Sequence, residues 1–185
     1  MKTFQDLQEG LNDPNIFKAF FLAGGPGSGK SYVVRKTTGG TGLKIVNSDD
    51  AFEKLLKDAG LSLKMPPEEE KPRDVQRKRA KALTKKRQAN YLEGRIGLII
   101  DGTGKDYDKI AKQSNELRQL GYDTHMIFVN TSLDTALERN AARDRSVPES
   151  IAVKSWKTVQ SNIGKFSQHF RQNFIVVDNN DSTED

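Results

Sequence analysis

Short apolar runs recur along the chain and are separated by stretches with helical spacing of apolar positions. The runs are rich in β-branched and aromatic residues and are nearly continuous, which is typical of parallel strands covered on both faces. We predict five such strands, at residues 17–23, 43–46, 96–100, 123–130 and 174–177. The pattern therefore predicts a buried parallel sheet.

Helical patterns fill the segments between the predicted strands. We expect helices at residues 31–36, 51–59, 73–93, 106–120, 133–143 and 149–170, the last with a break near Gly164. Asp49 or Asp50 stands at the N-cap position of the second helix, and Gly121 stands where the fourth would end. Strands that alternate with helices predict an α/β fold with right-handed crossovers.

Length and composition fit one domain. The chain has 185 residues, of which 35% are apolar and 30% charged. It has no cysteine, which excludes a disulfide scaffold and a thiol nucleophile and fits a reducing cytoplasm. No apolar run approaches the roughly 20 residues of a membrane helix, and the N-terminus lacks a signal-peptide pattern. We expect a soluble cytoplasmic protein.

Positive charge is concentrated in one segment of the chain. Residues 71–95 hold ten Lys and Arg and two acids, a net charge of +8, whereas the remainder has a net charge of −3. Such an excess indicates a polyanionic partner, and the alternative is a solvated, lysine-rich helix face. Residues 61–73 contain three of the six prolines and are expected to form an extended, mobile connector. The last eight residues are polar and acidic and are expected to fray.

A phosphate-binding motif follows the first predicted strand. Residues 24–31 match G-x-x-x-x-G-K-[ST] in full and precede a predicted helix, which is the context that the motif requires. Glycines let backbone N–H groups converge on phosphate oxygens. We expect Lys30 to reach the β- and γ-phosphates and the Ser31 hydroxyl to bind Mg²⁺. The residues expected to hold the nucleotide are Gly25, Pro26, Gly27, Ser28, Gly29, Lys30 and Ser31.

Carboxylates follow two of the other predicted strands. Ligands of open parallel sheets bind at the carboxyl ends of strands, so Asp49, Asp50 and Asp101 should lie near the phosphate loop. A carboxylate beside the γ-phosphate can accept the proton of an attacking hydroxyl. We expect one residue of the pair Asp49 and Asp50 to be this base and the other to cap the helix. For Asp101 the alternatives are a role at Mg²⁺ or the acceptor and an ordinary strand-end turn.

Two arginines follow the fourth predicted strand. Arg139 and Arg143 are four residues apart, so in a helix they would share one face. Two guanidiniums on one face can clamp a triphosphate and neutralise charge in a transition state. The alternative is ordinary salt bridging with Glu138 or Asp144. Residues 139–148 also end in Val-Pro before another helix, an arrangement similar to a kinase lid.

The order of these motifs resembles a known family. After the phosphate loop come Asn47-x-Asp49-Asp50, an apolar strand ending in Asp101-x-Thr103, and Arg139-Asn140-x-x-Arg143 with Val147-Pro148. This order resembles the kinase domain of phage-type polynucleotide 5′-kinases and is similar, more loosely, to zeta-toxin-like P-loop kinases. The resemblance covers about residues 17–178. It implies a P-loop kinase fold, a three-layer sandwich with a helical lid, and the use of ATP and Mg²⁺. If the protein is phage-encoded, the cytoplasm in which we expect it is that of the host.

The resemblance also implies roles for particular residues. The general base, the phosphate-loop pair, the carboxylate after the third strand and the lid arginines fall on Asp49, Lys30, Ser31, Asp101, Arg139 and Arg143. Phe52 and Ser48 stand where the family often has arginine, which argues against a 3′-phosphorylated nucleic-acid end as the acceptor. A related phage class, which phosphorylates hydroxymethylated pyrimidines during DNA modification, is a further alternative.

These observations predict an ATP- and Mg²⁺-dependent kinase whose acceptor is a hydroxyl of a nucleic acid or nucleotide. The residues expected to bind the acceptor are Asp50, Asp101, Thr103, Arg77 and Lys81. One alternative is a small-molecule kinase for a nucleoside or sugar. Another is a nucleic-acid-binding ATPase without an acceptor, against which the lack of a glutamate after Asp101 counts. A loop that only binds nucleotide is the last alternative.

The expected organisation is a single kinase domain at residues 17–180. It follows an N-terminal extension at residues 1–16 and precedes a disordered acidic tail at residues 181–185. Within the domain, residues 61–95 would form a basic acceptor-binding or lid insertion, and residues 139–148 an arginine lid.

Overall fold

The computed structural model describes residues 17–38, 41–64, 66–143 and 146–180. Its centre is an all-parallel sheet with the order β2-β3-β1-β4-β5. The strands are β1 (Lys18–Ala23), β2 (Lys44–Val46), β3 (Leu98–Asp101), β4 (Asp123–Asn130) and β5 (Phe174–Asp178). The five predicted strands are confirmed, and the segment after β1 leaves from the middle of the sheet.

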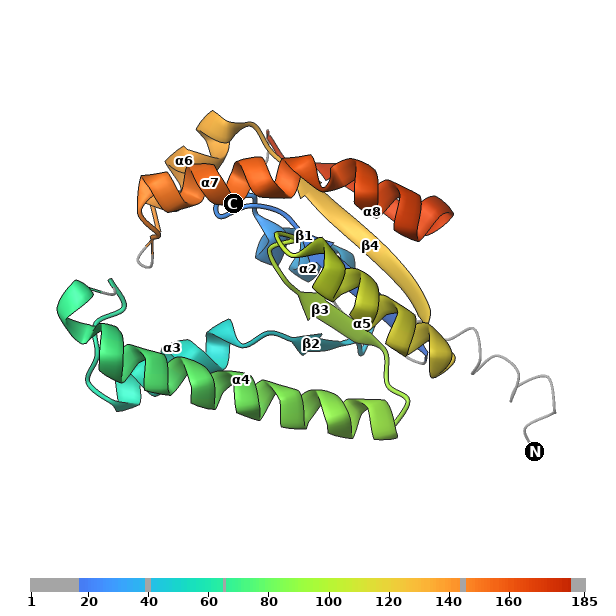
Figure 1. The fold of residues 1–185 in the computed structure, drawn as a ribbon, viewed down its shortest axis with the longest axis horizontal. Coiled ribbons are helices and arrows are strands. Elements are labelled where there is room, and N and C mark those ends of the chain that lie inside the picture. Colours follow the sequence, from blue (N-terminus) through green and yellow to red (C-terminus); the bar gives the residue numbers. More distant parts are fainter. Residues whose placement is uncertain (1–16, 39–40, 65, 144–145, 181–185) are drawn as a thin grey trace.

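Seven α-helices surround the sheet in the described part of the chain (Figure 1). They are α2 (Lys30–Thr38), α3 (Asp49–Asp58), α4 (Glu70–Glu93), α5 (Tyr107–Gln119), α6 (Leu133–Ala141), α7 (Glu149–Ser161) and α8 (Ile163–Phe170). Helices α5, α7 and α8 cover one face of the sheet, and α2 covers the other. The predicted α/β fold is therefore confirmed.

Alternating side chains of the central strand build the two halves of the core. Phe21 packs with Phe166 and Phe170 of α8 on one face, whereas Leu22 packs with Val33 of α2 on the other. Each of these side chains is at most 5% exposed. Because successive strand residues point to opposite faces, a nearly continuous apolar strand serves both layers at once.

Helices α3 and α4 form a pair beside the edge strand β2. Phe52 and Leu56 of α3 are buried against Ala80 of α4, and the Arg77 guanidinium lies 4.0 Å from the centre of the Phe52 ring. The Thr84 hydroxyl of α4 donates to the carbonyl of Asn47, which follows β2, at 3.4 Å. The apolar face of α3 is thus fixed on α4, and this fixes the direction of its polar face.

Two predicted helix starts differ from the structure. The N-cap of α3 is Ser48, whose side chain makes no capping hydrogen bond, so Asp49 and Asp50 occupy the first turn. The expected connector 61–73 is helical over its last seven residues, because a 3₁₀ turn (η2, Pro67–Glu69) leads directly into α4. Proline is tolerated in a first helical turn, where its missing N–H costs no hydrogen bond.

Two further predictions concern the C-terminal part of the chain. The predicted helix break near Gly164 is confirmed and lies at Asn162, whose buried amide donates to the carbonyls of Gly104 and Lys105, both at 3.0 Å. The expected fraying of residues 178–185 is wrong for its first part: Asp178 ends β5, and Asn179 is 5% exposed. Residues 181–185, like the expected extension 1–16, lie outside the described residues.

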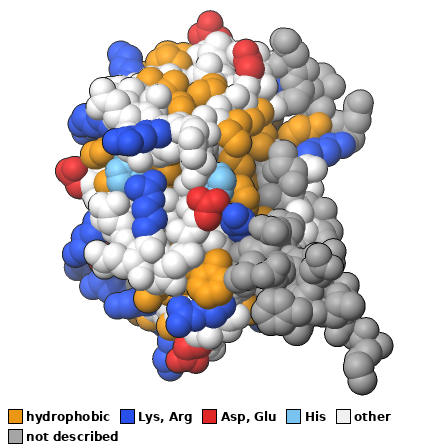
Figure 2. All heavy atoms as spheres, turned by 90° about the vertical axis from the view of Figure 1, so that its right-hand side faces the viewer, with side chains coloured by type: hydrophobic (Ala, Val, Ile, Leu, Met, Phe, Trp, Pro, Cys, Tyr) orange, Lys and Arg blue, Asp and Glu red, His pale blue; other side chains and the backbone are white. Residues whose placement is uncertain are grey.

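Basic, acidic and apolar side chains intermingle on the face of the molecule seen in Figure 2.

The two histidines of the chain make packing contacts. The His125 ring stacks on Phe20 at 4.9 Å and its Nε2 lies 2.8 Å from Asp123, and the His169 ring meets the edge of Phe170 at 4.8 Å. No helix in the described ranges is long and apolar enough to cross a membrane.

Candidate active site

The phosphate loop connects β1 to α2 at the carboxyl edge of the sheet. Gly27 and Gly29 have φ angles of 78° and 79°, a left-handed conformation that glycine adopts without steric cost. The Gly24 N–H donates to the Thr103 carbonyl at 3.0 Å, which ties the start of the loop to the segment after β3. Helix α2 begins at Lys30, so its free N–H groups face the loop and favour an anion there.

Lys30 lies folded along the phosphate loop. Its Nζ donates to the carbonyls of Gly24 at 2.7 Å and Gly25 at 3.2 Å. The pKa of Lys30 is lowered to about 8, chiefly by burial. The charge of Asp101 raises this pKa, that of Arg143 lowers it, and that of Asp49 raises it. A phosphate that entered the loop would supply the negative charge that this buried ammonium group lacks.

A cavity of about 400 Å³ opens beside the phosphate loop. Loop residues 27–31 line one side, and Asp49, Asp50 and Glu53 of α3 line the other. Lys57 of α3, Asp101 at the end of β3 and Arg143 beyond α6 complete the charged lining. Basic and acidic groups thus meet in one space, next to a helix N-terminus.

Asn47 connects the Asp101 carboxylate to the backbone of Asp49. Its Nδ2 donates to Asp101 at 2.8 Å, and its Oδ1 accepts from the backbone N–H of Asp49 at 2.7 Å. Burial raises the pKa of Asp101, and the charges of Asp49 and Asp50 raise it as well, whereas Lys30 and the Asn47 hydrogen bond lower it. Asn47 therefore sets the position of Asp49 relative to Asp101.

The donor set of the cavity suits Mg²⁺. The Ser31 hydroxyl and the Asp101 carboxylate are oxygen donors at its wall, and Mg²⁺ usually combines one or two carboxylates with water and substrate phosphates. Among the described residues, no group of three or more His, Asp or Glu is placed to hold a metal by itself. The residues present therefore fit a metal that arrives together with a nucleotide.

The two arginines of the expected lid do not share a helix face. Helix α6 ends at Ala141, so Arg143 lies past it, where it lines the cavity. Arg139 lies within α6, and its guanidinium donates to the carbonyls of Asn179 at 2.6 Å and Asn180 at 3.0 Å. The predicted i, i+4 pairing is wrong, because the helix stops between the two residues.

The structure places the other expected site residues in two groups. Asp49, Asp50, Asp101 and residues 27–31 meet at the cavity. The cavity lining does not include Gly25, Pro26, Thr103, Arg77 or Lys81. The two basic residues of this second group belong to α4, where Arg77 covers the Phe52 ring and Lys81 is exposed.

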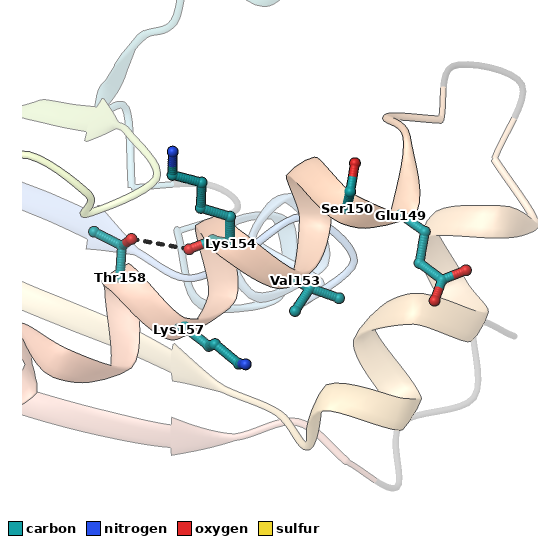
Figure 3. A pocket seen from close by; sticks show the side chains of 6 residues that line it. All are labelled: Glu149, Ser150, Val153, Lys154, Lys157 and Thr158. Carbon is teal, nitrogen blue, oxygen red and sulfur yellow. Dashed lines mark hydrogen bonds between the residues drawn. The ribbon is translucent and has the colours of Figure 1, made fainter.

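A second hollow lies along α7 and is lined by one helix only. Its volume is about 660 Å³. Figure 3 shows its six lining side chains, with the amines of Lys154 and Lys157 pointing away from each other. Because its charged groups do not converge, this hollow is a weaker candidate site than the cavity at the phosphate loop.

The comparison with protein families decides the classification. The sequence matches the family described as Zeta toxin over residues 5–185. The chain belongs to the Zeta toxin family. The fold is that of a P-loop kinase-like protein. The phosphate loop, the parallel sheet and the acidic first turn of α3 are parts of it. Among curated proteins, none matches the sequence.

Solved structures share the fold of this Zeta toxin family member at low sequence identity. A candidate kinase from Chloroflexus aurantiacus is 17% identical, with 89% of each chain covered and a TM-score of 0.62. A chain of the AvrRxo1-ORF1:ORF2 structure with ATP is 15% identical, with a TM-score of 0.70, 94% of this chain covered and 58% of that one. A chain of the Pnkp1/Rnl/Hen1 RNA repair complex is 22% identical, with a TM-score of 0.62, and covers 82% of this chain and 47% of its own length.

Several residues that line the cavity were not predicted from the sequence. Asn47 belonged to a motif but had no role assigned to it, and Glu53 and Lys57 line the cavity although neither was singled out. Glu53 and Lys57 follow Asp49 at intervals of four residues, a spacing that puts all three on one helix face. The same spacing puts Phe52 and Leu56 on the buried face, so the signal was present in the sequence.

Proposed function

We propose that this protein is an ATP-dependent kinase that transfers the γ-phosphoryl group to a hydroxyl of a nucleic acid, at its 5′ end or at a hydroxymethylated base, or of a nucleotide. The observation that carries the proposal is the single cavity in which Lys30 of the phosphate loop, Asp49 and Arg143 meet. The Zeta toxin family and its P-loop kinase-like fold support a phosphotransferase. The fold shared with a chain of an ATP-containing structure supports ATP as the donor.

The proposed reaction divides the charged groups between donor and acceptor. The loop amides and Lys30 bind the phosphates, and Asp49 orients the acceptor hydroxyl and takes its proton. The acceptor oxygen forms a bond to the γ-phosphorus while the bond to the β-phosphate bridging oxygen breaks, and ADP leaves. Arg143 neutralises charge on the transferred group. Ser31 and Asp101 would hold Mg²⁺, which neutralises phosphate charge when it is bound.

Arg139 enters this proposal differently from Arg143. Both arginines were expected to act on the phosphates, and Arg143 lies at the cavity, where it can do so. The guanidinium of Arg139 is engaged by two backbone carbonyls. We therefore propose that Arg143 alone neutralises the charge of the transition state.

The composition of the cavity also favours a second acceptor class. On its acceptor side Asp49, Asp50 and Glu53 face the space, together with Lys57. The Lys57 amine pairs with Glu53 at 2.9 Å, so repulsion of a phosphodiester backbone would come chiefly from Asp49 and Asp50. Neither Arg77 nor Lys81 lines the cavity. A small-molecule acceptor that offers a hydroxyl, such as a nucleoside or sugar, is therefore the alternative.

The test is transfer of labelled γ-phosphate from ATP to a panel of acceptors with Mg²⁺. The panel holds 5′-hydroxyl DNA, 5′-hydroxyl RNA, hydroxymethylpyrimidine DNA, nucleotides, nucleosides and sugars, and Lys30→Ala is the control for contaminating kinases. We expect label on an oligonucleotide or nucleotide that disappears with Lys30→Ala. Label on nucleosides or sugars alone would replace the leading acceptor by the alternative. Hydrolysis of ATP without a labelled acceptor would contradict the kinase proposal.

A further inference from the structure

The back of the phosphate loop, away from the cavity, is covered by three different elements. Three alternate glycines of the loop each meet one neighbour. The pairs are Gly25 with Trp156 of α7, Gly27 with Ala136 of α6, and Gly29 with Asn179 after β5. A Cβ on Gly27 would overlap the Ala136 carbonyl oxygen, and one on Gly29 would overlap the Asn179 amide nitrogen. Glycine is therefore required there by packing as well as by phosphate binding.

Asn179 makes the one polar contact among these three neighbours. Its side chain is buried, and its Nδ2 donates to the Ser28 carbonyl at 2.9 Å. Its backbone N–H donates to the Asn130 carbonyl at 2.9 Å, which fixes it at the end of β4. The amide is thus held by the sheet and reaches the loop from behind.

The contact with Ser28 fixes the direction of a phosphate-binding N–H group. In a trans peptide the C=O and the N–H are coplanar and point in opposite directions. The Ser28 carbonyl and the Gly29 N–H belong to the same peptide. Because Asn179 holds the carbonyl behind the loop, the Gly29 N–H points to the opposite side, where Gly29 lines the cavity.

Arg139 of α6 holds Asn179 in place. Its Nη1 donates to the Asn179 carbonyl at 2.6 Å, and its Nη2 donates to the Asn180 carbonyl at 3.0 Å. The Asn180 side chain in turn accepts from the backbone N–H of Ser132, the N-cap of α6, at 2.7 Å. Both ends of α6 are therefore bonded to the turn that follows β5.

We propose that Asn179 and Arg139 are positioning residues that hold the Ser28–Gly29 peptide in its phosphate-binding orientation. The proposal rests on the proposed function, since the ligand is the triphosphate of ATP. Neither side chain has to touch the nucleotide: Arg139 acts on Asn179, and Asn179 acts on the loop. Their loss should weaken binding of ATP and of ADP and leave the transfer rate at saturating ATP nearly unchanged.

Four variants test the proposal, with thermal unfolding measured for each. Asn179→Ala removes the amide, and Asn173→Ala is its matched control, because the Asn173 Nδ2 donates to Asp123 at 3.0 Å and to the Thr124 carbonyl at 3.1 Å near the start of β4. Arg139→Lys keeps the charge but loses the fork of two donors. Arg118→Lys is its control, because Arg118 donates to Thr124 at 2.7 Å and to the His169 carbonyl at 3.4 Å.

Nucleotide affinity is measured by titration calorimetry and by the fluorescence of Trp156, the single tryptophan of the chain, which packs against Gly25. We expect Asn179→Ala to raise the Kd for ATP about tenfold and Arg139→Lys to raise it several-fold. The KM for ATP should rise by the same factors, with kcat kept. Asn173→Ala and Arg118→Lys should bind ATP as the wild type does.

Each other outcome has a defined meaning. Wild-type affinity in folded Asn179→Ala and Arg139→Lys would overturn the positioning role, as would an equal loss in the two control variants. If Asn179→Ala does not fold, the comparison of Arg139→Lys with Arg118→Lys decides. A wild-type protein that does not bind ATP would instead contradict the proposed function itself.

Discussion

Lys30 and Asp101 are buried ionisable groups, and burial shifts the pKa of each toward its neutral form. The Lys30 amine is bonded to two loop carbonyls and has a pKa of about 8, chiefly because it is buried. Asp101 shows the opposite shift for the same reason, since burial raises the pKa of its carboxyl group. Each group is thus in surroundings that disfavour its charge, and a bound Mg²⁺–nucleotide complex would supply partners of both signs.

The shift of Lys30 predicts how nucleotide affinity depends on pH. Below about pH 8 the amine is protonated in the free protein, and above it the amine becomes neutral. Bound phosphates favour the charged form and raise the pKa, so ATP binding takes up a proton above pH 8. The Kd for ATP should therefore rise only about twofold between pH 7 and 8 and then up to about tenfold per pH unit above that.

Calorimetric titration with ATP from pH 7 to 9.5 checks this dependence. The control is Lys30→Arg, whose guanidinium stays charged over the whole range, so that the rise in Kd should vanish. A wild-type Kd that does not change up to pH 9.5 would show that the charge of Lys30 does not contribute to binding.

At the scale of elements, α3 has two faces with different tasks. Phe52 and Leu56 pack on α4, and the face with Asp49, Glu53 and Lys57 lines the cavity. Helix α4 uses Arg77 to cover Phe52, so part of the basic segment is structural. The lysines of α4 are exposed and do not line the cavity. Any contact of these lysines with a nucleic acid would therefore lie beside the chemistry, along the helix.

Neutralising the exposed lysines of α4 separates the two acceptor classes. The variant replaces four of them by Gln: Lys78, Lys81, Lys85 and Lys86. For an oligonucleotide acceptor we expect a higher KM and an unchanged kcat. The log–log salt slope should become smaller by about 0.7 for each phosphate of a single strand that the variant no longer neutralises. The readout is phosphoryl transfer at several salt concentrations.

The matched control removes four exposed lysines of the α5–α8 side, Lys105, Lys109, Lys112 and Lys165. It makes the same change in net charge without touching α4, so it should leave the KM for the oligonucleotide near the wild-type value. Equal effects of the two quadruple variants would mean that α4 is an ordinary solvated helix. That outcome would favour a small-molecule acceptor.

At the scale of the whole molecule, the sequence predicted the elements better than their arrangement. Each strand can be recognised in the sequence because it is a short, nearly continuous apolar run. The loop at residues 24–31 can be recognised because phosphate binding restricts its composition. The order β2-β3-β1-β4-β5 has no such local signal, since it depends on how each crossover packs. The cavity depends on that order, because it brings the end of β3, with Asp101, beside the phosphate loop.

The site was predicted where it follows the chain locally and was missed where distant segments meet. Asp49 and Lys30 belong to motifs that can be read directly. The contacts of Asn179 with Ser28 and of Arg139 with the turn after β5 join residues that are 151 and about 40 positions apart. Asn179 was therefore expected in a frayed tail, whereas its amide is buried behind the phosphate loop.

The most direct test of the kinase account compares the wild type with Asp49→Asn, a change that removes the base and preserves the shape of the side chain. We expect phosphoryl transfer to fall at least 100-fold, with the Kd for ATP changed by less than about threefold, because Asp49 acts on the acceptor. Asp50→Asn, measured beside it, should raise the KM for the acceptor and keep most of kcat. Full transfer by Asp49→Asn would contradict the account, and loss of transfer in Asp50→Asn alone would move the base to Asp50.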